Sequence, residues 1–563
     1  MDSQNTNDTK EPIKSREENL PKKFYANERL TNNLSLRKRK INEIISKQRG
    51  LERFKKEGNI GYAIIKDNLN IEPEIKNKIY EDVETFLNQI KKFIKHENIE
   101  YNKYALYCLR NQITSNNNFN NKTYLAEEIQ KKDFFSDILF LIQKYFDNKQ
   151  IIFESLWIFI NVLYYLKDTT DLSLFLSNKN CINLYIKILD KKDDCLRFHI
   201  YWLISNLICN DKVNVADEVL FHLYMSPFFR LYIFKNLEEG IAMSENEIVC
   251  IFNILSQLSN FISNTFIYLQ NNNIQHFLNY NSDVDFNSIQ ENNNFLFYHS
   301  LKFFLLNIEK PELSFYCIYG ISKLSNYLED QKAYNDFFKT GVVRKLVKEQ
   351  IKYDEDCLDY VVQITGNFLS CTKDELIDLI ILEEIMAFYI KLIQNYPERQ
   401  MLKRDIFWSL SNITSGNLMF CEKFAKSGLL EITLQAIYSD SDLVIDQALF
   451  TLLGFFDSNN MELIVKYYYL NYMKFLTLCL KNLKDRINSS ENMYKKDLVE
   501  RIFACIGFLF DNGEFLKGNL KNKFVEDFEK NGGFEILENM LSEHVFDNKI
   551  QELGENLLKY RNN

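Results

Sequence analysis

The feature that most constrains the fold is a helical segment that recurs along most of the chain. The segment RDIFWSLSNITSGN (404–417) has diluted copies, among them FESLWIFINVL (153–163), HIYWLISNLICND (199–211) and FYCIYGISKLSN (315–326). The positions equivalent to Trp408 are Trp157, Trp202, Phe252, Tyr319, Gln363, Trp408 and Phe450, with spacings of 45, 50, 67, 44, 45 and 42 residues. At 67.1 kDa the chain exceeds what one hydrophobic core fills. The recurrence therefore predicts a stack of repeated helical units.

A second element lies between the copies and completes the repeat. The segments KTGVVRKLVKEQI (339–351), KSGLLEITLQAI (426–437) and KNGGFEILENML (530–541) each place Gly before an amphipathic pattern, where a positive φ suits the end of the preceding helix. Each repeat is expected to contain a short helix, a Gly turn, a middle helix and a third helix with Trp and Asn. The period is typical of armadillo or HEAT units. Only 16 Gly and 6 Pro in 563 residues also favour helix. We therefore predict an all-α, right-handed superhelical solenoid over residues 75–563, with the third helices lining its inner groove.

All three tryptophans are followed four residues later by asparagine, in the pairs Trp157–Asn161, Trp202–Asn206 and Trp408–Asn412. This spacing places both side chains on one helix face. A core role explains any single Trp, but Asn in a helix interior has poor propensity and is costly to bury unpaired. A row of Asn amides could instead bind a peptide backbone, and indole faces attract Lys or Arg. Nearby acids such as Glu154 and Asp211 would favour a basic ligand. The pattern predicts a site for extended, Lys-rich peptides.

The charge of the chain is unevenly distributed. The net charge is −9, yet the run from Arg37 to Arg53 has seven basic residues against two acidic ones. Residues 1–30 are polar and without periodicity, and we expect them to be disordered. Residues 31–60 are expected to form a flexible basic arm, partly helical, that a partner with an acidic groove would order. A solvated tail, a nucleic-acid contact and a localisation signal are the alternatives for this arm.

Other classes of function find little support in the sequence. It contains no GxxxxGK[ST], HExxH or GxSxG motif, so we predict no enzyme and no cofactor. The eleven cysteines show no metal-type spacing, which indicates no metal site, and His199 is expected on a helix surface. Residues 1–20 are polar and charged, so we expect no signal peptide there, and 151–166 is expected to be a buried helix rather than a membrane span. The acidic body disfavours specific nucleic-acid binding. The Asn-rich stretch 270–295 is expected to be an insertion, as a surface loop or an added helix.

In the order of its repeats, the sequence resembles the importin-α family, the armadillo-repeat adaptors of nuclear import. FESLWIFIN is similar to that family's second repeat and RDIFWSLSNITSGN to its seventh. CIYGISKLSN and QITGNFLS resemble the fifth and sixth, and the ending from 528 resembles the last. The resemblance implies about ten armadillo repeats. The segment SLRKRKINEIISKQRGLERFKKEGN is similar to the importin-β-binding segment that precedes those repeats, which implies importin-β-binding roles for Arg37, Lys38, Arg39, Lys40, Lys47, Arg49 and Arg53.

The same resemblance implies two peptide sites. The major signal-binding site would comprise Trp157, Asn161, Trp202, Asn206 and Asp211. In the family an acidic residue stands at the position of Asn210, and Asp211 would take over its role here. The minor site would comprise Asn367, Trp408 and Asn412. The fourth repeat departs from the family with Phe252 and Ser256. The eighth repeat departs with Phe450 and Gly454, the positions that would form half of the minor site. Glu57, within Phe54-Lys55-Lys56-Glu57, is expected to weaken self-inhibition by the arm.

The hypothesis that follows is a nuclear-import adaptor that shuttles between cytoplasm and nucleus. Its expected partners are basic signal peptides of cargo proteins, importin-β and, for recycling, an export receptor, with no membrane insertion. The alternative is an armadillo scaffold that has lost classical cargo transport and binds another extended partner. Binding of importin-β would discriminate between the two.

Overall fold

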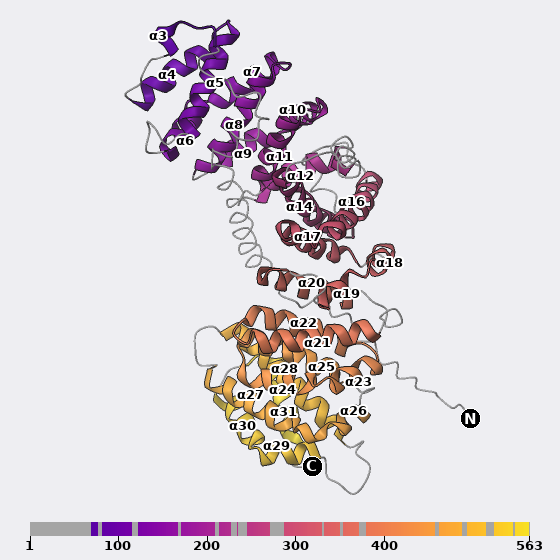
Figure 1. The fold of residues 1–563 in the computed structure, drawn as a ribbon. Coiled ribbons are helices and arrows are strands. Elements are labelled where there is room, and N and C mark those ends of the chain that lie inside the picture. Colours follow the sequence, from indigo (N-terminus) through magenta and orange to yellow (C-terminus); the bar gives the residue numbers. More distant parts are fainter. Residues whose placement is uncertain are drawn as a thin grey trace, which may run out of the picture. The chain divides into compact units, whose positions relative to one another are not determined.

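The computed structural model describes residues 69–76, 82–114, 122–166, 170–208, 213–226, 233–234, 245–270, 286–328, 331–348, 353–370, 379–456, 461–486, 492–513, 523–543 and 546–561. Within these ranges every regular element is a helix (Figure 1). The chain divides into two compact units, an N-terminal unit up to Ile251 and a C-terminal unit from Phe252. The expected arm (31–60), with all seven of its basic residues, the N-terminal segment 1–30 and Asp211 lie outside the described residues.

The N-terminal unit is a stack of three-helix repeats. Its third helices are α5 (Ile99–Thr114), α8 (Lys149–Tyr165) and α11 (Asp194–Ile208), and α8 packs against both of the others. Each third helix also packs on a middle helix: α4 (Val83–Ile94), α7 (Phe134–Lys144) and α10 (Lys179–Asp190), respectively. The shorter helices are α3 (Pro73–Lys76), α6 (Lys122–Lys131), α9 (Thr170–Ser177) and α12 (Val213–Met225). As predicted, residues 151–165 belong to a buried helix, α8, and Leu166 is its C-cap.

The C-terminal unit repeats the same order. Its third helices pack in sequence, each on the next: α17 (Pro311–Leu324), α20 (Leu358–Ser370), α22 (Gln400–Thr414), α25 (Asp442–Phe455), α28 (Asn492–Asn512) and α31 (Asn548–Lys559). The middle helices are α16 (Phe286–Asn307), α19 (Val342–Val347), α21 (Leu379–Asn395), α24 (Leu429–Ser439), α27 (Tyr472–Arg486) and α30 (Gly533–Glu543). The short helices are α18 (Gln331–Lys339), α23 (Leu418–Lys426), α26 (Met461–Lys466) and α29 (Lys523–Lys530), with 3₁₀ turns η3 (Ser325–Tyr327), η4 (Glu355–Cys357) and η7 (Tyr468–Leu470).

Helix α14 (Glu245–Gln270) occupies the corresponding third-helix position in the sequence and contains the unit boundary. Counting α14, the described part of the chain has ten helices in the third position. The expectation of about ten repeats and an all-α solenoid is therefore confirmed. The right hand of the superhelix stays a prediction. Of the Asn-rich insertion, residues 286–295 begin α16, so this part forms a helix rather than a loop.

Local signals explain where these helices begin. Gly341, Gly428 and Gly532 have φ values of 64°, 87° and 75°, as their place before the middle helices predicts. Because such φ values strain residues with a Cβ, glycine is suited to these turns. Asparagine supplies several N-caps: the Asn148 and Asn417 side chains accept hydrogen bonds from the backbone N–H groups of Ile151 and Phe420, both at 3.1 Å. The abundance of Asn thus has a structural part in this chain.

Ion pairs join successive repeats. Lys149 pairs with Asp193 at 2.7 Å, and Arg399 pairs with Asp359 at 2.9 Å. In each case the two residues stand about one repeat apart in the sequence. The stack therefore combines an apolar interior with charged contacts between equivalent helices.

Candidate functional site

The best-defined candidate site is a row of polar side chains on α20 and α22. On α20 the half-buried residues Asp359, Gln363 and Asn367 follow one another at four-residue spacing, while most residues between them are buried. On α22 Trp408, Ser411 and Asn412 are half-buried in the same way. This spacing places each set on one side of its helix. The sequence correctly equated Gln363 with Trp408, because both lie on the partly exposed side of a third helix. We call Asn367, Trp408 and Asn412 the Asn–Trp row.

Close packing of α20 on α22 positions the Asn–Trp row. Gly366 provides the space: a Cβ at this position would lie 2.2 Å from Cζ3 of Trp408, far inside contact distance. Nδ2 of Asn412 donates to the carbonyl oxygen of Gly366 at 3.4 Å. The indole and the amide of repeat seven are therefore seated on the backbone of repeat six.

The amide of Asn367 is held from the other side. Its Nδ2 donates to Ser325 Oγ at 2.8 Å and to Asn326 Oδ1 at 2.6 Å. Among the residues that the structure describes, Oδ1 of Asn367 and Oδ1 of Asn412 accept no hydrogen bond, and both side chains are half-exposed. Each amide thus retains an acceptor, and a backbone N–H of an extended peptide is its natural donor.

The predicted major-site residues lie together in the N-terminal unit. Trp157 on α8 and Trp202 on α11 meet edge to face with ring centroids 6.2 Å apart. Nδ2 of Asn161 donates to the carbonyl oxygen of Trp157 at 2.8 Å, and Asn161 is buried. Trp202 is 5% exposed, whereas Trp157 and Asn206 are half-buried. The structure brings these four residues close to one another, and their role in binding stays a prediction.

His199 was expected on a helix surface, and that expectation was wrong. Its ring lies beside both tryptophans, with centroids 5.1 Å from Trp157 and 6.2 Å from Trp202, and the residue is 2% exposed. Its Nδ1 donates to the carbonyl oxygen of Cys195 at 2.7 Å, while the buried Nε2 finds no hydrogen-bond partner among the described residues. Burial lowers the pKa of His199 to about 4, so the ring is neutral at pH 7.

Glu154 was expected to attract a basic ligand, and the structure shows that it is engaged internally. Its side chain is fully buried and forms an ion pair with Arg110 of the preceding third helix, α5. A buried carboxylate needs such a partner. Since an Arg of the chain already neutralises it, Glu154 is not an available acid for a peptide.

The fourth, fifth and eighth repeats differ from the Asn–Trp row. Phe252 and Ser256 are fully buried, and Ser256 Oγ donates to the carbonyl oxygen of Asn253 at 2.7 Å. Tyr319 is buried as well, with Lys323 Nζ 5.2 Å from its ring centroid. In repeat eight, Gly454 lies against Thr414 and Ser415 of the preceding repeat, where a Cβ would be 2.6 Å from Thr414 Oγ1. At the positions of the Trp–Asn pair, these three repeats therefore carry different side chains.

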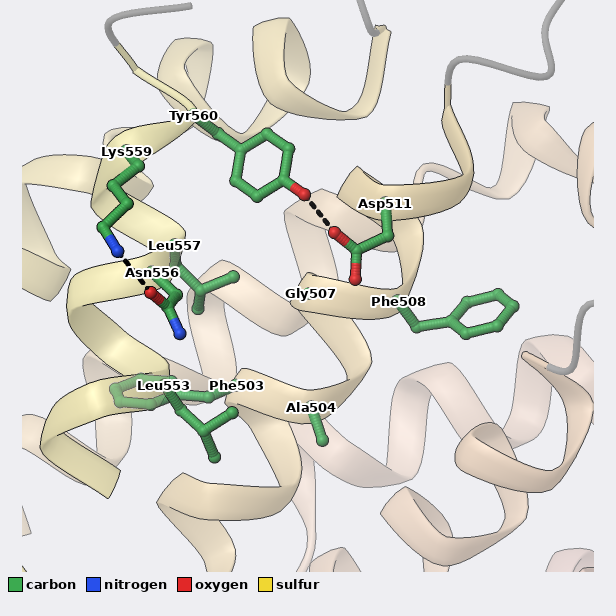
Figure 2. A pocket seen from close by; sticks show the side chains of 10 residues that line it. All are labelled: Phe503, Ala504, Gly507, Phe508, Asp511, Leu553, Asn556, Leu557, Lys559 and Tyr560. Carbon is green, nitrogen blue, oxygen red and sulfur yellow. Dashed lines mark hydrogen bonds between the residues drawn. The ribbon is translucent and has the colours of Figure 1, made fainter. Parts of the chain in front are cut away.

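A pocket of about 620 Å³ lies between the last two third helices, α28 and α31 (Figure 2). Phe503, Gly507 and Leu557 give it apolar walls. On its rim, Tyr560 OH donates to Asp511, and Lys559 Nζ donates to Asn556 Oδ1 at 2.6 Å. Since these polar groups are bonded to one another, the pocket suits an apolar side chain better than a charged ligand.

The described residues hold neither a metal-binding cluster nor a helix able to cross a membrane. No group of three or more His, Cys, Asp or Glu in this part of the chain could hold a metal ion. Among the described helices, none has both the length and the apolar character that crossing a membrane requires. Nine cysteines are described, all of them free thiols, and most are buried.

Comparison with known proteins agrees with the repeat fold. No protein-family model matches the chain, and no curated protein matches its sequence. The crystal structure of an engineered protein is similar over 85% of this chain and 99% of its own, with a TM-score of 0.56 and 13% identity. A designed armadillo repeat protein in complex with the peptide (KR)4 covers 46% of this chain and 98% of its own (TM-score 0.35, 19% identity). One computationally designed for modular peptide recognition covers 47% and 99% (0.35, 17%).

The class of the protein follows from the order of its own helices, and the first of these structures shares that fold over 85% of the chain. It is an all-α solenoid of armadillo-like three-helix repeats. At such identities the likenesses concern the fold, and what this chain binds must be argued from its own residues.

Proposed function

We propose that the protein is a nuclear-import adaptor that holds extended, Lys/Arg-rich signal peptides of cargo proteins along its third helices. The observation that carries the proposal is the Asn–Trp row. Two amides on neighbouring helices, each with an acceptor oxygen available within the described part of the chain, flank a half-exposed indole. This is the combination that an extended basic peptide requires.

The mechanism of binding follows from the chemistry of the row. Backbone N–H groups of the peptide would donate to Oδ1 of Asn367 and Asn412, which holds the chain extended without regard to its sequence. The face of Trp408 would hold the stem and charge of a Lys or Arg, a contact that contributes about 0.5–2 kcal/mol. The acidic balance of the chain outside residues 37–53 would favour basic peptides further.

The remaining parts of the adaptor are proposed on the sequence resemblance. Trp157, Asn161, Trp202 and Asn206, with Asp211, would form the major signal-binding site. The basic arm of residues 31–60 would bind importin-β, and an export receptor would return the empty adaptor to the cytoplasm. Such a protein would shuttle between cytoplasm and nucleus.

A second candidate is a scaffold that binds another extended partner and has lost classical cargo transport. The observation that favours it is the state of repeats four, five and eight. Phe252 is buried, and cations of the chain itself lie over Tyr319 and Phe450. A protein that reads long bipartite signals would need more of these positions open to its ligand.

Binding of importin-β separates the two candidates. The full chain is compared with a variant in which Arg37, Lys38, Arg39 and Lys40 are replaced by Ala, using purified importin-β and isothermal titration calorimetry. An adaptor binds importin-β and loses most of the affinity in the variant. A scaffold that binds another extended partner does not bind importin-β. Failure to bind importin-β, with the protein folded by circular dichroism, would reject the adaptor and favour the scaffold.

A further inference from the structure

Arg501 lies on α28 and belongs to none of the sequence motifs described above. Its guanidinium carbon lies 3.8 Å from the ring centroid of Phe450 on α25, and the guanidinium forms an ion pair with Asp446, one turn before that ring. The Arg501 side chain is 16% exposed. The second oxygen of Asp446 accepts a hydrogen bond from Gln447 Nε2 at 3.0 Å. Arg501 is thus stacked on an aromatic face and paired with a carboxylate at once.

Phe450 occupies in repeat eight the position that Trp408 occupies in repeat seven, 42 residues earlier. The contacts that Arg501 makes there are those proposed for a basic side chain of the cargo: a ring face for the cation and an acid beside it. In this structure the cation comes from the chain itself, from the neighbouring third helix.

We propose that Arg501 acts as an internal ligand of the Phe450 position and closes it to the bound peptide. Arg501 is therefore a residue that determines specificity, because it restricts reading of basic side chains in the C-terminal unit to α20 and α22. The inference rests on the proposed function and identifies which part of the solenoid performs it.

The opposite end of the row agrees with this limit. In repeat five Lys323 stands where repeat seven has Asn412, and its Nζ lies over the ring of Tyr319. The open positions thus lie on two packed helices, α20 and α22. Packed helices are about 8–10 Å apart and an extended residue spans about 3.4 Å, so each helix accommodates about three residues of the peptide. Two helices therefore accommodate a core of about six residues. The C-terminal unit is expected to read a short basic motif.

A purely structural ion pair between α25 and α28 would make a different prediction. Replacing Arg501 would then lower stability and leave peptide selectivity unchanged. If Arg501 is an internal ligand, its removal opens a position that a cation from outside can fill. Selectivity for a longer basic peptide, rather than stability, is therefore the informative quantity.

The experiment uses the full chain and fluorescence anisotropy of labelled peptides, with Asn161→Ala/Asn206→Ala in every protein so that the proposed major site does not mask binding in the C-terminal unit. The core peptide has six Lys/Arg residues, and each extended peptide adds one Arg two, three or four residues beyond either end, with Ala as the spacer. The proteins are this background alone, Arg501→Ala, Arg501→Ala/Asp446→Asn and Arg561→Ala. Arg561 is the matched control, because it also lies over a ring, that of Phe534 at 5.8 Å, and pairs with Glu538 at 2.8 Å. If Arg501→Ala does not fold, Arg501→Gln replaces it.

The background alone and Arg561→Ala should bind the core and extended peptides equally. Arg501→Ala should bind one extended peptide about 3- to 30-fold more tightly than the core, and the added Asp446→Asn should reduce that gain. Equal binding of core and extended peptides by Arg501→Ala would overturn the inference and leave the proposed function intact. Binding of an extended peptide by Arg501→Ala alone would support the inference and show that the Asn–Trp row of the natural chain does not bind the peptide. No binding by any folded protein would reject both the inference and peptide binding by the row.

Discussion

Gly366 allows the seating of Trp408 to be tested by one substitution. In Gly366→Ala the new Cβ would lie 2.2 Å from Cζ3, 2.9 Å from Cε3 and 3.0 Å from Cη2 of Trp408, so the ring must move. A matched substitution exists on another third helix. At Gly507 of α28 a new Cβ would meet only Leu557 Cδ2, at an ordinary 3.5 Å.

The difference between the two variants isolates the cost of the clash. Replacing Gly by Ala inside a helix stabilises by about 0.5–1 kcal/mol, and this gain applies to both positions. Overpacking a fitted site costs about 1–3 kcal/mol and applies only to position 366. Gly507→Ala should therefore be more stable than wild type. Gly366→Ala should be about 1–3 kcal/mol less stable than Gly507→Ala, because the helix-propensity gain cancels in the comparison.

Urea unfolding followed by tryptophan fluorescence measures this difference. A Trp157→Phe/Trp202→Phe background leaves Trp408 as the reporter, so a displaced indole should also shift its emission to longer wavelength in the folded state. Gly366→Ala should weaken peptide binding in addition, since the ring leaves the Asn–Trp row. Equal stabilisation by both substitutions, with unchanged Trp408 emission, would refute the packing of Trp408 on Gly366.

Three further predictions concern charge and the N-terminal arm. Arg197 and Glu247 form an ion pair with both side chains 3% exposed, so Arg197→Met should destabilise the N-terminal unit by about 3–5 kcal/mol. The control Arg561→Met breaks an exposed ion pair and should cost about 0–1 kcal/mol. The midpoints of urea unfolding measure both changes. Burial lowers the pKa of His199 from 6.5 to about 4, so the unfolded state binds the proton more readily than the folded state. The free energy of unfolding should be highest above pH 6.5 and fall by about 3 kcal/mol as the pH drops towards 4. The variant His199→Phe should not show this loss. Because Glu57 interrupts the basic run after Arg53, deleting residues 1–60 should change the affinity for a basic peptide little, and a large gain in anisotropy titrations would contradict weak self-inhibition.

The fold was largely predictable because the length of the repeat can be read directly from the sequence. Trp408 and its equivalents recur at the spacing of the third helices, and Gly341, Gly428 and Gly532 mark the turns that require positive φ. Position within a helix also predicted which side chains share a face, as Asn367 and Asn412 show. These features depend on residues close together in the sequence, because their spacing within one helix determines the face on which each side chain lies.

The partners of charged residues were not predicted, because they lie one repeat away. Glu154 pairs with Arg110 and Asp446 with Arg501, across neighbouring third helices. His199 was misplaced because a single polar residue on an aromatic helix can face either side. A search for opposite charges separated by about one repeat would have pointed to these pairs. Such a search would have shown which acids remain for a ligand.

The most direct test of peptide binding by the Asn–Trp row uses the full chain with Asn161→Ala/Asn206→Ala, which removes the proposed major site, and measures its affinity for a labelled Lys/Arg-rich peptide with and without the row. The variant is Asn367→Ala/Asn412→Ala. Its matched control is Asn482→Ala, on the middle helix α27, whose Nδ2 donates to the Tyr438 carbonyl oxygen at 3.4 Å, the same distance as in the Asn412–Gly366 bond. In this background, binding should be micromolar or tighter with the row intact and with Asn482→Ala, and it should be lost when Asn367→Ala/Asn412→Ala is added. Unchanged affinity after Asn367→Ala/Asn412→Ala in a folded protein, or no binding with the row intact, would contradict peptide binding by the row.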